Sequence, residues 1–276
     1  MPRRTSLELS TGHFYIETVD YLESINTWNF KPTPVVVDAR SIYNRYDEDE
    51  PVKMVGTFSW SANIANSAVW RSNLDMTTWT GTFDSTARVM AGDLINGSIR
   101  VSTKNQKSSA HADVWRGVTA LGTEIMIDGE YMMNTGSGVT DAWPVKLAAG
   151  FTTAAHLQKL KGTYSISAGG SVLTGNCMLL DPELRAETEN FLRYAATLKG
   201  QGTPASCTGH PLLVKICTGD AVVGYRSETA VGTFHDGTAT GDADSVLLTG
   251  LTMEFADEQL VKLSGEAAII AAITVA

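Results

Sequence analysis

Three cysteines and two histidines come closest, by type and spacing, to forming a chemical site in this chain. Cys207 and His210 stand three positions apart, and Cys217 follows seven positions later. Thiolate and imidazole groups are ligands that zinc prefers, so these three form a candidate zinc set. Cys177 or His235 would supply the fourth ligand. Structural zinc usually draws on paired Cys-x-x-Cys units, which this sequence lacks, so we expect buried cysteines and no bound metal.

A hydrolytic site would need a histidine close to a serine or cysteine nucleophile. The candidate histidines are scattered along the chain: His111, His156, His210 and His235. No Gly-x-Ser-x-Gly sequence surrounds a serine. The one local group with the character of a general base is His111 with Asp113, beside Trp115. Because this group lies on a polar loop, we expect it to face solvent or a partner.

Gly200 to Ala205 fits a relaxed form of the Gly-x-Gly-x-x-Ala nucleotide-binding motif. Such a motif must follow a strand and open a helix. This segment follows a predicted helix and contains Pro204, so we interpret it as a helix end and a loop. The acidic clusters at 47–50 and 242–244 lack the spacing of a calcium loop. We therefore expect no cofactor, no metal site and no enzymatic activity.

Length, composition and charge favour a β-rich structural protein over a nucleic-acid binder. The chain has 276 residues, 43% of them hydrophobic and only 18% charged, with 30 acidic and 21 basic side chains for a net charge of −9. Affinity for phosphates comes from Lys and Arg, so an acidic chain is a poor sequence-independent binder. No apolar run follows Arg3 and Arg4, and no stretch approaches the roughly 20 apolar residues of a membrane helix. We expect no membrane association and folding in a reducing cytoplasm.

A repeated phrase indicates how the chain is built. Residues 53–62 (KMVGTFSWSA) return as 159–168 (KLKGTYSISA), and a fainter echo stands at 261–267 (VKLSGEA). In the first two, aromatic residues or Ile alternate with Ser, which is the pattern of a half-buried strand. The repeat predicts architecture rather than catalysis. One hypothesis is a duplication of two related β units, 51–155 and 156–276.

The wider pattern predicts a mainly β fold, a β-sandwich or partial barrel with one flanking helix. That helix is expected at Asp181–Lys199, because Asp181 and Pro182 have the types of an N-cap and a first helical residue, and Gly200 would end it. A weaker helix is expected at 153–160, and an exposed loop or hairpin tip at 102–113. Residues 1–50 would form an N-terminal extension to a β-rich domain at 51–276. Strands are expected at 15–19, 33–37, 55–61, 73–79, 97–102, 123–133, 212–217, 221–225, 245–255 and 261 onward.

Five of the tryptophans cluster between residues 60 and 143: Trp60, Trp70, Trp79, Trp115 and Trp143. Tryptophan is favoured in cores and in interfaces that keep one wet edge. We expect core packing or subunit contacts. The alternative is a carbohydrate-binding β-sandwich that presents Trp60, Trp70 or Trp115 on one face.

Three segments stand in an order that is similar to a known family. Residues 73–79 contain Asp75-Met76-Thr77, residues 83–92 contain Arg88, and residues 94–102 contain Gly97-Ser98. Together they resemble the central stretch of tail tube proteins of long-tailed bacteriophages. Residues 248–255 and 261–265 resemble that family's closing strands. The resemblance covers about a third of the chain, and the first fifty residues and the predicted helix have no counterpart.

The resemblance implies a structural virion protein of the phage tail, made in the host cytoplasm. Its sheets would join neighbouring copies into a ring, a hexamer or a trimer, and stacked rings would enclose a channel for DNA ejection. Other tail proteins would be partners, and DNA would pass the lumen without specific binding. A tube terminator, connector or baseplate ring is an alternative within the tail. A capsid decoration or cement protein, a carbohydrate-binding module and a hydrolase using His111 or His210 are the alternatives outside it.

Overall fold

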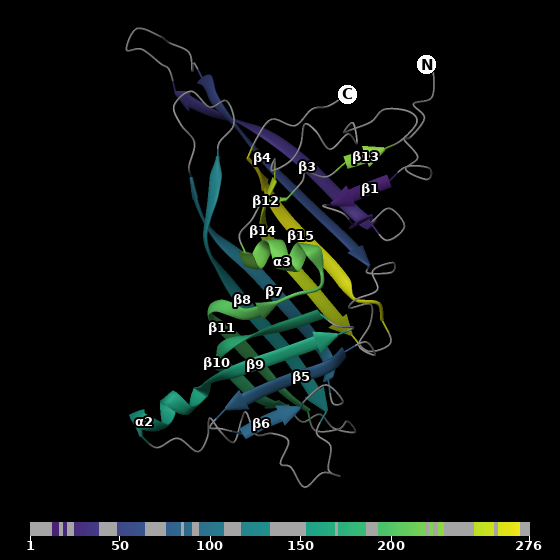
Figure 1. The fold of residues 1–276 in the computed structure, drawn as a ribbon. Coiled ribbons are helices and arrows are strands. Elements are labelled where there is room, and N and C mark those ends of the chain that lie inside the picture. Colours follow the sequence, from purple (N-terminus) through teal and green to yellow (C-terminus); the bar gives the residue numbers. More distant parts are fainter. Residues whose placement is uncertain are drawn as a thin grey trace.

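One large antiparallel sheet dominates the computed structural model of this chain (Figure 1). The structure describes residues 13–16, 19–20, 25–38, 49–63, 76–83, 86–89, 94–107, 117–132, 153–168, 171–185, 193–218, 221–222, 226–228, 246–256 and 259–270. Within these ranges the fold is mainly β, as the sequence predicts. A small separate sheet contains β13 (Arg226–Glu228), β1 (His13–Ile16) and β2 (Val19–Asp20).

The large sheet has two free ends and does not close into a barrel. Its spatial order runs from one edge strand to the other as β3 (Ile25–Asp38), β4 (Asp49–Asn63), β15 (Lys262–Ile269), β14 (Val246–Ala256), β7 (Leu94–Lys107), β8 (Val118–Met132), β11 (Arg193–Cys207), β10 (Ser171–Arg185), β9 (Lys161–Ala168), β5 (Met76–Phe83) and β6 (Thr86–Val89). The short strand β12 (Ala221–Val222) pairs with one end of β14. The helical elements are α2 (Ala154–Leu157), the 3-10 turn η4 (Gln158–Leu160) and α3 (Pro211–Thr218).

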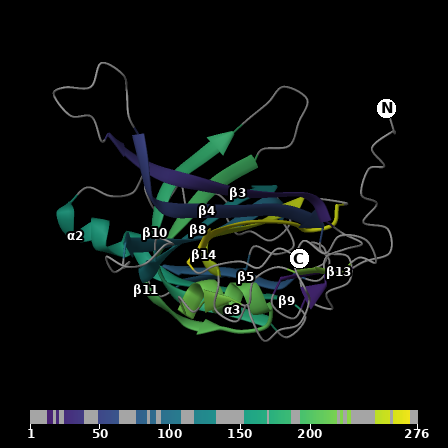
Figure 2. The same cartoon turned by 90° about the horizontal axis from the view of Figure 1, so that it is seen from above.

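The sheet curls until strands far apart in its order face each other. Trp79 of β5 donates a 2.7 Å hydrogen bond from Nε1 to the hydroxyl of Tyr131 on β8. The centroids of the Trp79 ring and the Phe255 ring on β14 are 5.9 Å apart, with the two rings nearly perpendicular. In a flat sheet β5 and β8, four positions apart, would be separated by about 19 Å. Figure 2 shows the result: β3, β4 and β14 lie in one layer and β5 and β9 in a second. The core fills the space between them.

Alternation along each strand sends one set of side chains into this core. Phe58 and Trp60 of β4 are buried, as are Tyr164 and Ile166 of β9, while the intervening serines are only partly covered. The predicted burial of the aromatic and Ile positions in the repeated phrase is therefore confirmed. Whether the phrase reflects duplication stays a prediction.

The glycines of the repeated phrase face large side chains on the neighbouring strand. Gly265 pairs with Trp60 and Gly162 pairs with Phe83. A Cβ added to Gly265 would overlap the Trp60 ring, and one added to Gly162 would overlap the Phe83 ring. A ring lying over a glycine covers backbone that would otherwise stay unpacked and lets the sheet bend. The glycines of the repeated sequence therefore make room for large side chains of the neighbouring strand in the curled sheet.

The predicted helix at Asp181–Lys199 is wrong. Its first part is the end of β10 and its last part is the start of β11, which pair with each other from Glu183–Ala195 to Arg185–Arg193. Asp181 has φ 44°, and the register of the two strands shifts between Leu180 and Glu183. The Asp-Pro pair therefore marks a bulge in a strand instead of a helix start.

The predicted strand at Leu212–Cys217 is also wrong, because these residues form α3. Four of its residues are buried: Leu212, Leu213, Ile216 and Cys217. Their spacing of one and four positions places them on one face of a helix. Pro211 occupies the first helical position, where its missing N–H is not needed. This helix packs against β14, β11 and β7.

Several other expectations are confirmed. The weaker helix at 153–160 corresponds to α2 and η4. Of the segment at 102–113, residues 102–107 are described, and they lie in β7, which forms a long hairpin with β8. Residues 33–37, a predicted strand, lie in β3. The predicted boundary between the N-terminal extension and the β-rich domain, at residue 50, falls inside β4. The division into an extension and a β-rich domain stays a prediction.

Candidate functional site

The thiols of the candidate zinc set come together without forming a metal site. Cys207, at the end of β11, lies close enough to Cys217 of α3 to shift its pKa, and Cys177 is buried on β10 nearby. Burial raises the pKa of Tyr164, and the three thiols around it raise it further. Yet among the residues that the structure describes, no group of three His, Cys, Asp or Glu side chains could hold a metal ion. His235 lies outside the described residues.

His210 is part of the core rather than of a reactive site. It precedes α3, is 1% exposed, and its main-chain carbonyl accepts a hydrogen bond from the amide of Val214. Burial lowers the pKa of its imidazole from 6.5 to about 4. At neutral pH the ring is therefore uncharged, which suits a packing role.

We expect His210 to make the fold sensitive to acid. Above pH 6.5 the ring is neutral in both the folded and the unfolded chain and has no effect. As the pH falls from 6.5 toward 4, the unfolded chain binds a proton that the folded chain does not, so the free energy of unfolding decreases, by about 3 kcal/mol in total. Urea unfolding at a series of pH values would measure this. His210→Gln should flatten the slope between pH 6.5 and 4, and an unchanged slope in this variant would show that His210 is not its source.

The remaining sequence candidates divide between buried residues and residues outside the described part. His111, Asp113 and Trp115 lie outside it, as do Trp70 and Trp143. Trp60 and Trp79 are buried in the core, as the core hypothesis predicts. Because Trp60 is only 3% exposed, it cannot present its ring to a glycan.

The segment from Gly200 to Ala205 is not the predicted helix end and loop. It belongs to β11, which continues through it to Cys207. Gly202 has φ 76°, and Gly200 lies opposite Ile125, whose Cβ would be 3.0 Å from an added Cβ. A nucleotide-binding turn requires a helix directly after the glycines. Here a strand continues, so the segment shapes the sheet.

Two hairpins extend beyond the rest of the large sheet, and the sequence alone does not reveal the first of them. β4 pairs with β15 only over Gly56–Asn63, yet it pairs with β3 up to Asp49. Residues 33–38 and 49–55 therefore form a two-stranded segment, named the β3–β4 arm. An isolated two-stranded hairpin is at best marginally stable in water.

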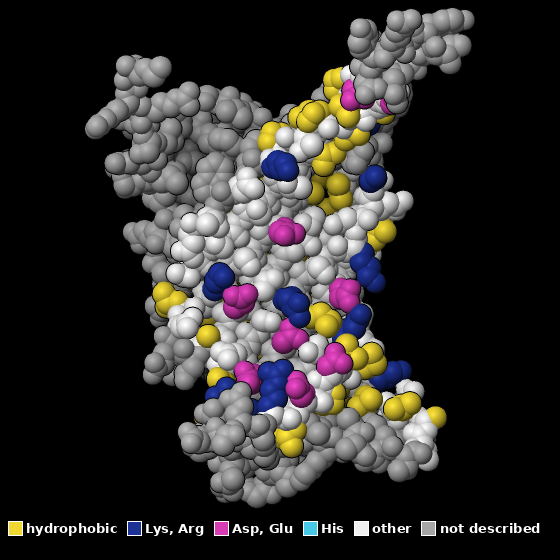
Figure 3. Space-filling model, turned by 180° about the vertical axis from the view of Figure 1, so that it is seen from behind, with side chains coloured by type: hydrophobic (Ala, Val, Ile, Leu, Met, Phe, Trp, Pro, Cys, Tyr) yellow, Lys and Arg dark blue, Asp and Glu magenta, His cyan; other side chains and the backbone are white. Residues whose placement is uncertain are grey.

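Exposed valines concentrate on the β3–β4 arm. Val36 is 50% exposed, Val37 45% and Val52 48%. Figure 3 shows hydrophobic side chains along this arm, at the upper right. Asp49 and Glu50, the described part of the acidic cluster at 47–50, are exposed on the same arm. Large apolar side chains gathered on a projecting hairpin mark a contact surface more often than a solvated one.

A second arm comes from β7 and β8. β7 pairs with β14 over Asn96–Ser102, and β8 pairs with β11 over Met126–Met132. Within the described residues, 103–107 and 118–123 therefore have each other as strand partners and no third strand beside them. Leu121 on this β7–β8 arm is 65% exposed. The sequence signal for this arm was its polar, non-periodic stretch, and it predicted exposure correctly.

The edge of the large sheet is partly blocked against strand addition. β3 is the edge strand, and it contains Pro32 and Pro34. Proline has no N–H to donate, and natural proteins use it on edge strands to prevent uncontrolled pairing. A partner would therefore reach β3 through side chains of the arm more readily than through the backbone around Pro32 and Pro34.

The outward face of the sheet carries interleaved charges of both signs. Lys199 lies 2.6 Å from Glu124 across β11 and β8, and this contact lowers the pKa of Glu124. Arg100 is paired with Asp128, which also accepts a 2.7 Å hydrogen bond from Thr197. Figure 3 shows the basic and acidic side chains alternating over this face. Such a surface gives no basic stripe for gripping phosphates.

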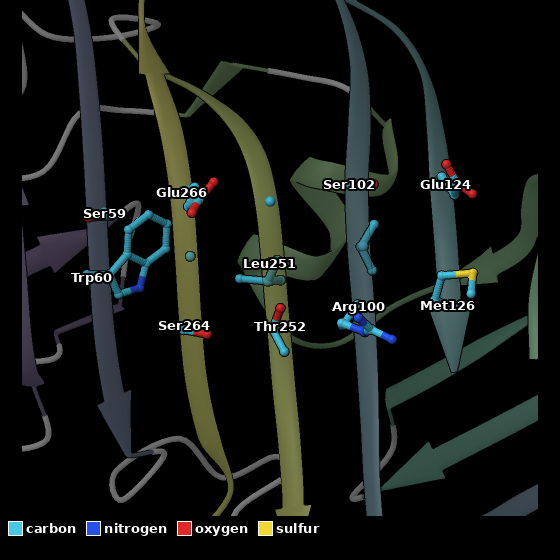
Figure 4. A pocket seen from close by; sticks show the side chains of 13 residues that line it. Ser59, Trp60, Arg100, Ser102, Glu124, Met126, Leu251, Thr252, Ser264 and Glu266 are labelled. Carbon is cyan, nitrogen blue, oxygen red and sulfur yellow. The ribbon is translucent and has the colours of Figure 1, made fainter. Parts of the chain in front are cut away.

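A hollow of about 440 Å³ lies on this face over β4, β15, β14, β7 and β8 (Figure 4). Ser59, Ser264 and Thr252 supply hydroxyls, and Arg100 and Glu124 supply opposite charges. Its described lining residues include no histidine or cysteine. The hollow therefore offers polar and charged contacts.

Comparisons with known proteins give little beyond this geometry. No protein-family model matches the sequence, and no curated protein matches it either. A chain from the tail of an empty gene transfer agent particle, solved with helical refinement and C6 symmetry, is similar with a TM-score of 0.35 and 12% identity, over 48% of this chain and 96% of that one. A chain from the virion of a native gene transfer agent particle has a TM-score of 0.34 and 14% identity, with the same coverage. TM-scores this low do not establish a shared fold.

Among the residues that the structure describes, no helix is long and apolar enough to cross a membrane.

Proposed function

We propose that this chain is a structural virion protein that self-assembles into stacked rings, forming a phage tail tube around a channel for DNA. The observation that carries the proposal is the β3–β4 arm. Three of its valines, Val36, Val37 and Val52, are about half exposed, and its two strands pair with no third strand among the described residues. A second copy of the chain would cover these side chains.

The open form of the sheet supports assembly through unlike surfaces. Its two ends are β3 and β6, which differ in length and sequence. Contacts between unlike surfaces generate rings when the rotation between copies closes. The β7–β8 arm provides a second projecting element, with Leu121 exposed, for contact with the next ring. The low likeness to the gene transfer agent chains adds no weight to this argument.

Electrostatics supports a channel that DNA can pass. The net charge is −9, and the basic side chains described on the outward face lie beside acidic ones. Phosphates are bound by unpaired Lys and Arg, so such a surface would repel the duplex weakly and leave it mobile. We propose no cofactor and no enzymatic activity for this protein.

Negative-stain electron microscopy, with the mass in solution measured alongside, would test the proposal. Rings or tubes with a channel wide enough for a duplex of about 20 Å are the expected result. Trimers without a channel would instead favour a capsid decoration protein. A chain that stays monomeric at every concentration, including when tail assembly intermediates are added, would contradict the proposal.

A further inference from the structure

The helix α3 is tied to the sheet at both of its ends. Near its N-terminus, the thiol of Cys207 on β11 lies 3.5 Å from the carbonyl oxygen of Leu213 and can donate to it. Near its C-terminus, the Thr123 hydroxyl lies 3.3 Å from the carbonyl oxygen of Ile216 and 3.4 Å from that of Cys217. α3 is therefore held between β11 and β8, and any change at these ties alters how it docks.

The two cysteines at this junction lie on facing surfaces. Leu213 and Cys217 are four positions apart in α3, so they share one face of the helix. Because Cys207 reaches the carbonyl of Leu213, it lies beside the face that carries Cys217. Each thiol is also close enough to the other to shift its pKa.

The two thiols differ in their exposure to solvent and in the direction of their pKa shifts. Cys207 is partly exposed, whereas Cys217 is 7% exposed. The neighbouring Cys217 thiol lowers the pKa of Cys207, whereas the Cys207 thiol and burial raise that of Cys217. The thiolate is the nucleophile in thiol oxidation, so Cys207 is the residue that reacts first.

We propose that Cys207 and Cys217 form a redox-active thiol pair that a peroxide converts into a disulfide joining β11 to α3. The Cys207 thiolate attacks one oxygen of hydrogen peroxide, giving a sulfenic acid and hydroxide. The Cys217 thiol then attacks that sulfur, forming the S–S bond and releasing water. Two thiols are oxidised and one peroxide is reduced, and an external thiol reverses the reaction.

The third cysteine provides a control within the same chain. Cys177 on β10 is completely buried, and burial raises its pKa to about 12. It lies near the same Tyr164, but it is on β10 and fully covered, so a peroxide does not reach it and it should not react. The proposal thus predicts one specific pairing out of the three that three cysteines allow.

The test is peroxide treatment of the full-length folded chain, followed by alkylation, proteolysis and mass spectrometry. We expect one cross-linked peptide that joins Cys207 to Cys217, lost on treatment with dithiothreitol, with Cys177 recovered as a free thiol. On a non-reducing gel the product should run as a monomer. In Cys217→Ser, dimedone should trap a sulfenic acid at Cys207, and in Cys207→Ser no cross-link should form. Cys177→Ala should behave like the natural chain.

Three outcomes would overturn the proposal. They are recovery of both Cys207 and Cys217 as free thiols, a cross-link that includes Cys177, and conversion of Cys207 to a sulfinic acid without a cross-link. If circular dichroism shows that a cysteine variant does not fold, peptide mapping of the unmodified chain decides the question by itself.

Discussion

Changing Val36, Val37 and Val52 together to lysine abolishes self-association and leaves the fold intact, if the β3–β4 arm is the assembly surface. These side chains are about half exposed in the single chain, so substituting them costs the fold little, within about 0.5 kcal/mol. In an assembly they would be covered. Losing the remaining burial of three valines weakens association by at least about 3 kcal/mol, roughly 100-fold in the dissociation constant. Lysine on an edge hairpin also opposes pairing with another chain.

Sedimentation velocity over a concentration series, with electron microscopy of the same samples, would measure this effect. Leu260→Lys is the matched control, because Leu260 is 48% exposed but lies two residues before β15, at the end of that strand away from the arm. The control should assemble as the natural chain does. Equal assembly by the triple variant and the control would show that the arm is not the contact. Thermal unfolding of both variants separates lost assembly from lost folding.

Most strands were predicted from the alternation of apolar and polar residues. The prediction failed where the same residues fit both the two-residue period of a strand and the 3.6-residue period of a helix. Tyr194, Ala196 and Leu198 are buried in β11 at every second position. The same stretch also offers apolar residues at helical spacing after an Asp-Pro pair, which imitates a helix start. The structure decides for a strand because Asp181 takes φ 44° and bulges the chain. Strand partners on both sides then supply backbone hydrogen bonds that a sequence pattern does not show.

At α3 the opposite error occurs, because a segment predicted as a strand is a helix. Leu212-Leu213-Val214 followed by Ile216 is a short apolar run, which periodicity alone cannot assign to a strand or a buried helix. Position in the fold settles it, since the run lies over the curled sheet and buries one face against β14, β11 and β7.

The candidate assembly surface could be predicted only in part. The polar stretch after Ser102 indicates an exposed hairpin, and the β7–β8 arm fits that prediction. Residues 35–37, three consecutive valines, look like a strand and do form one. Whether such a strand is covered depends on a third strand pairing beside it, and the described part of β15 pairs with β4 only as far as Gly56. That is a property of sheet topology, which a single sequence does not display.

Replacing Gly162 with alanine unfolds the chain at a much lower temperature than any exposed substitution should. An added Cβ would overlap the main-chain oxygen of Thr82 and come within 2.6 Å of the Phe83 ring. A ring can turn, but the oxygen moves only if β5 separates from β9, with which it pairs. Overpacking of this kind costs typically 1–3 kcal/mol, and we expect a value at or above about 3 kcal/mol because backbone must shift.

The comparison that isolates this effect is Gly122→Ala on the β7–β8 arm. An added Cβ there meets no atom within 4 Å. Alanine should therefore leave the stability unchanged or raise it by about 0.5 kcal/mol, since it restricts the unfolded chain. Thermal unfolding by circular dichroism should place Gly162→Ala at least about 6 °C below Gly122→Ala. If the two variants unfold at the same temperature, the close approach of β5 to β9 does not hold the curled sheet together.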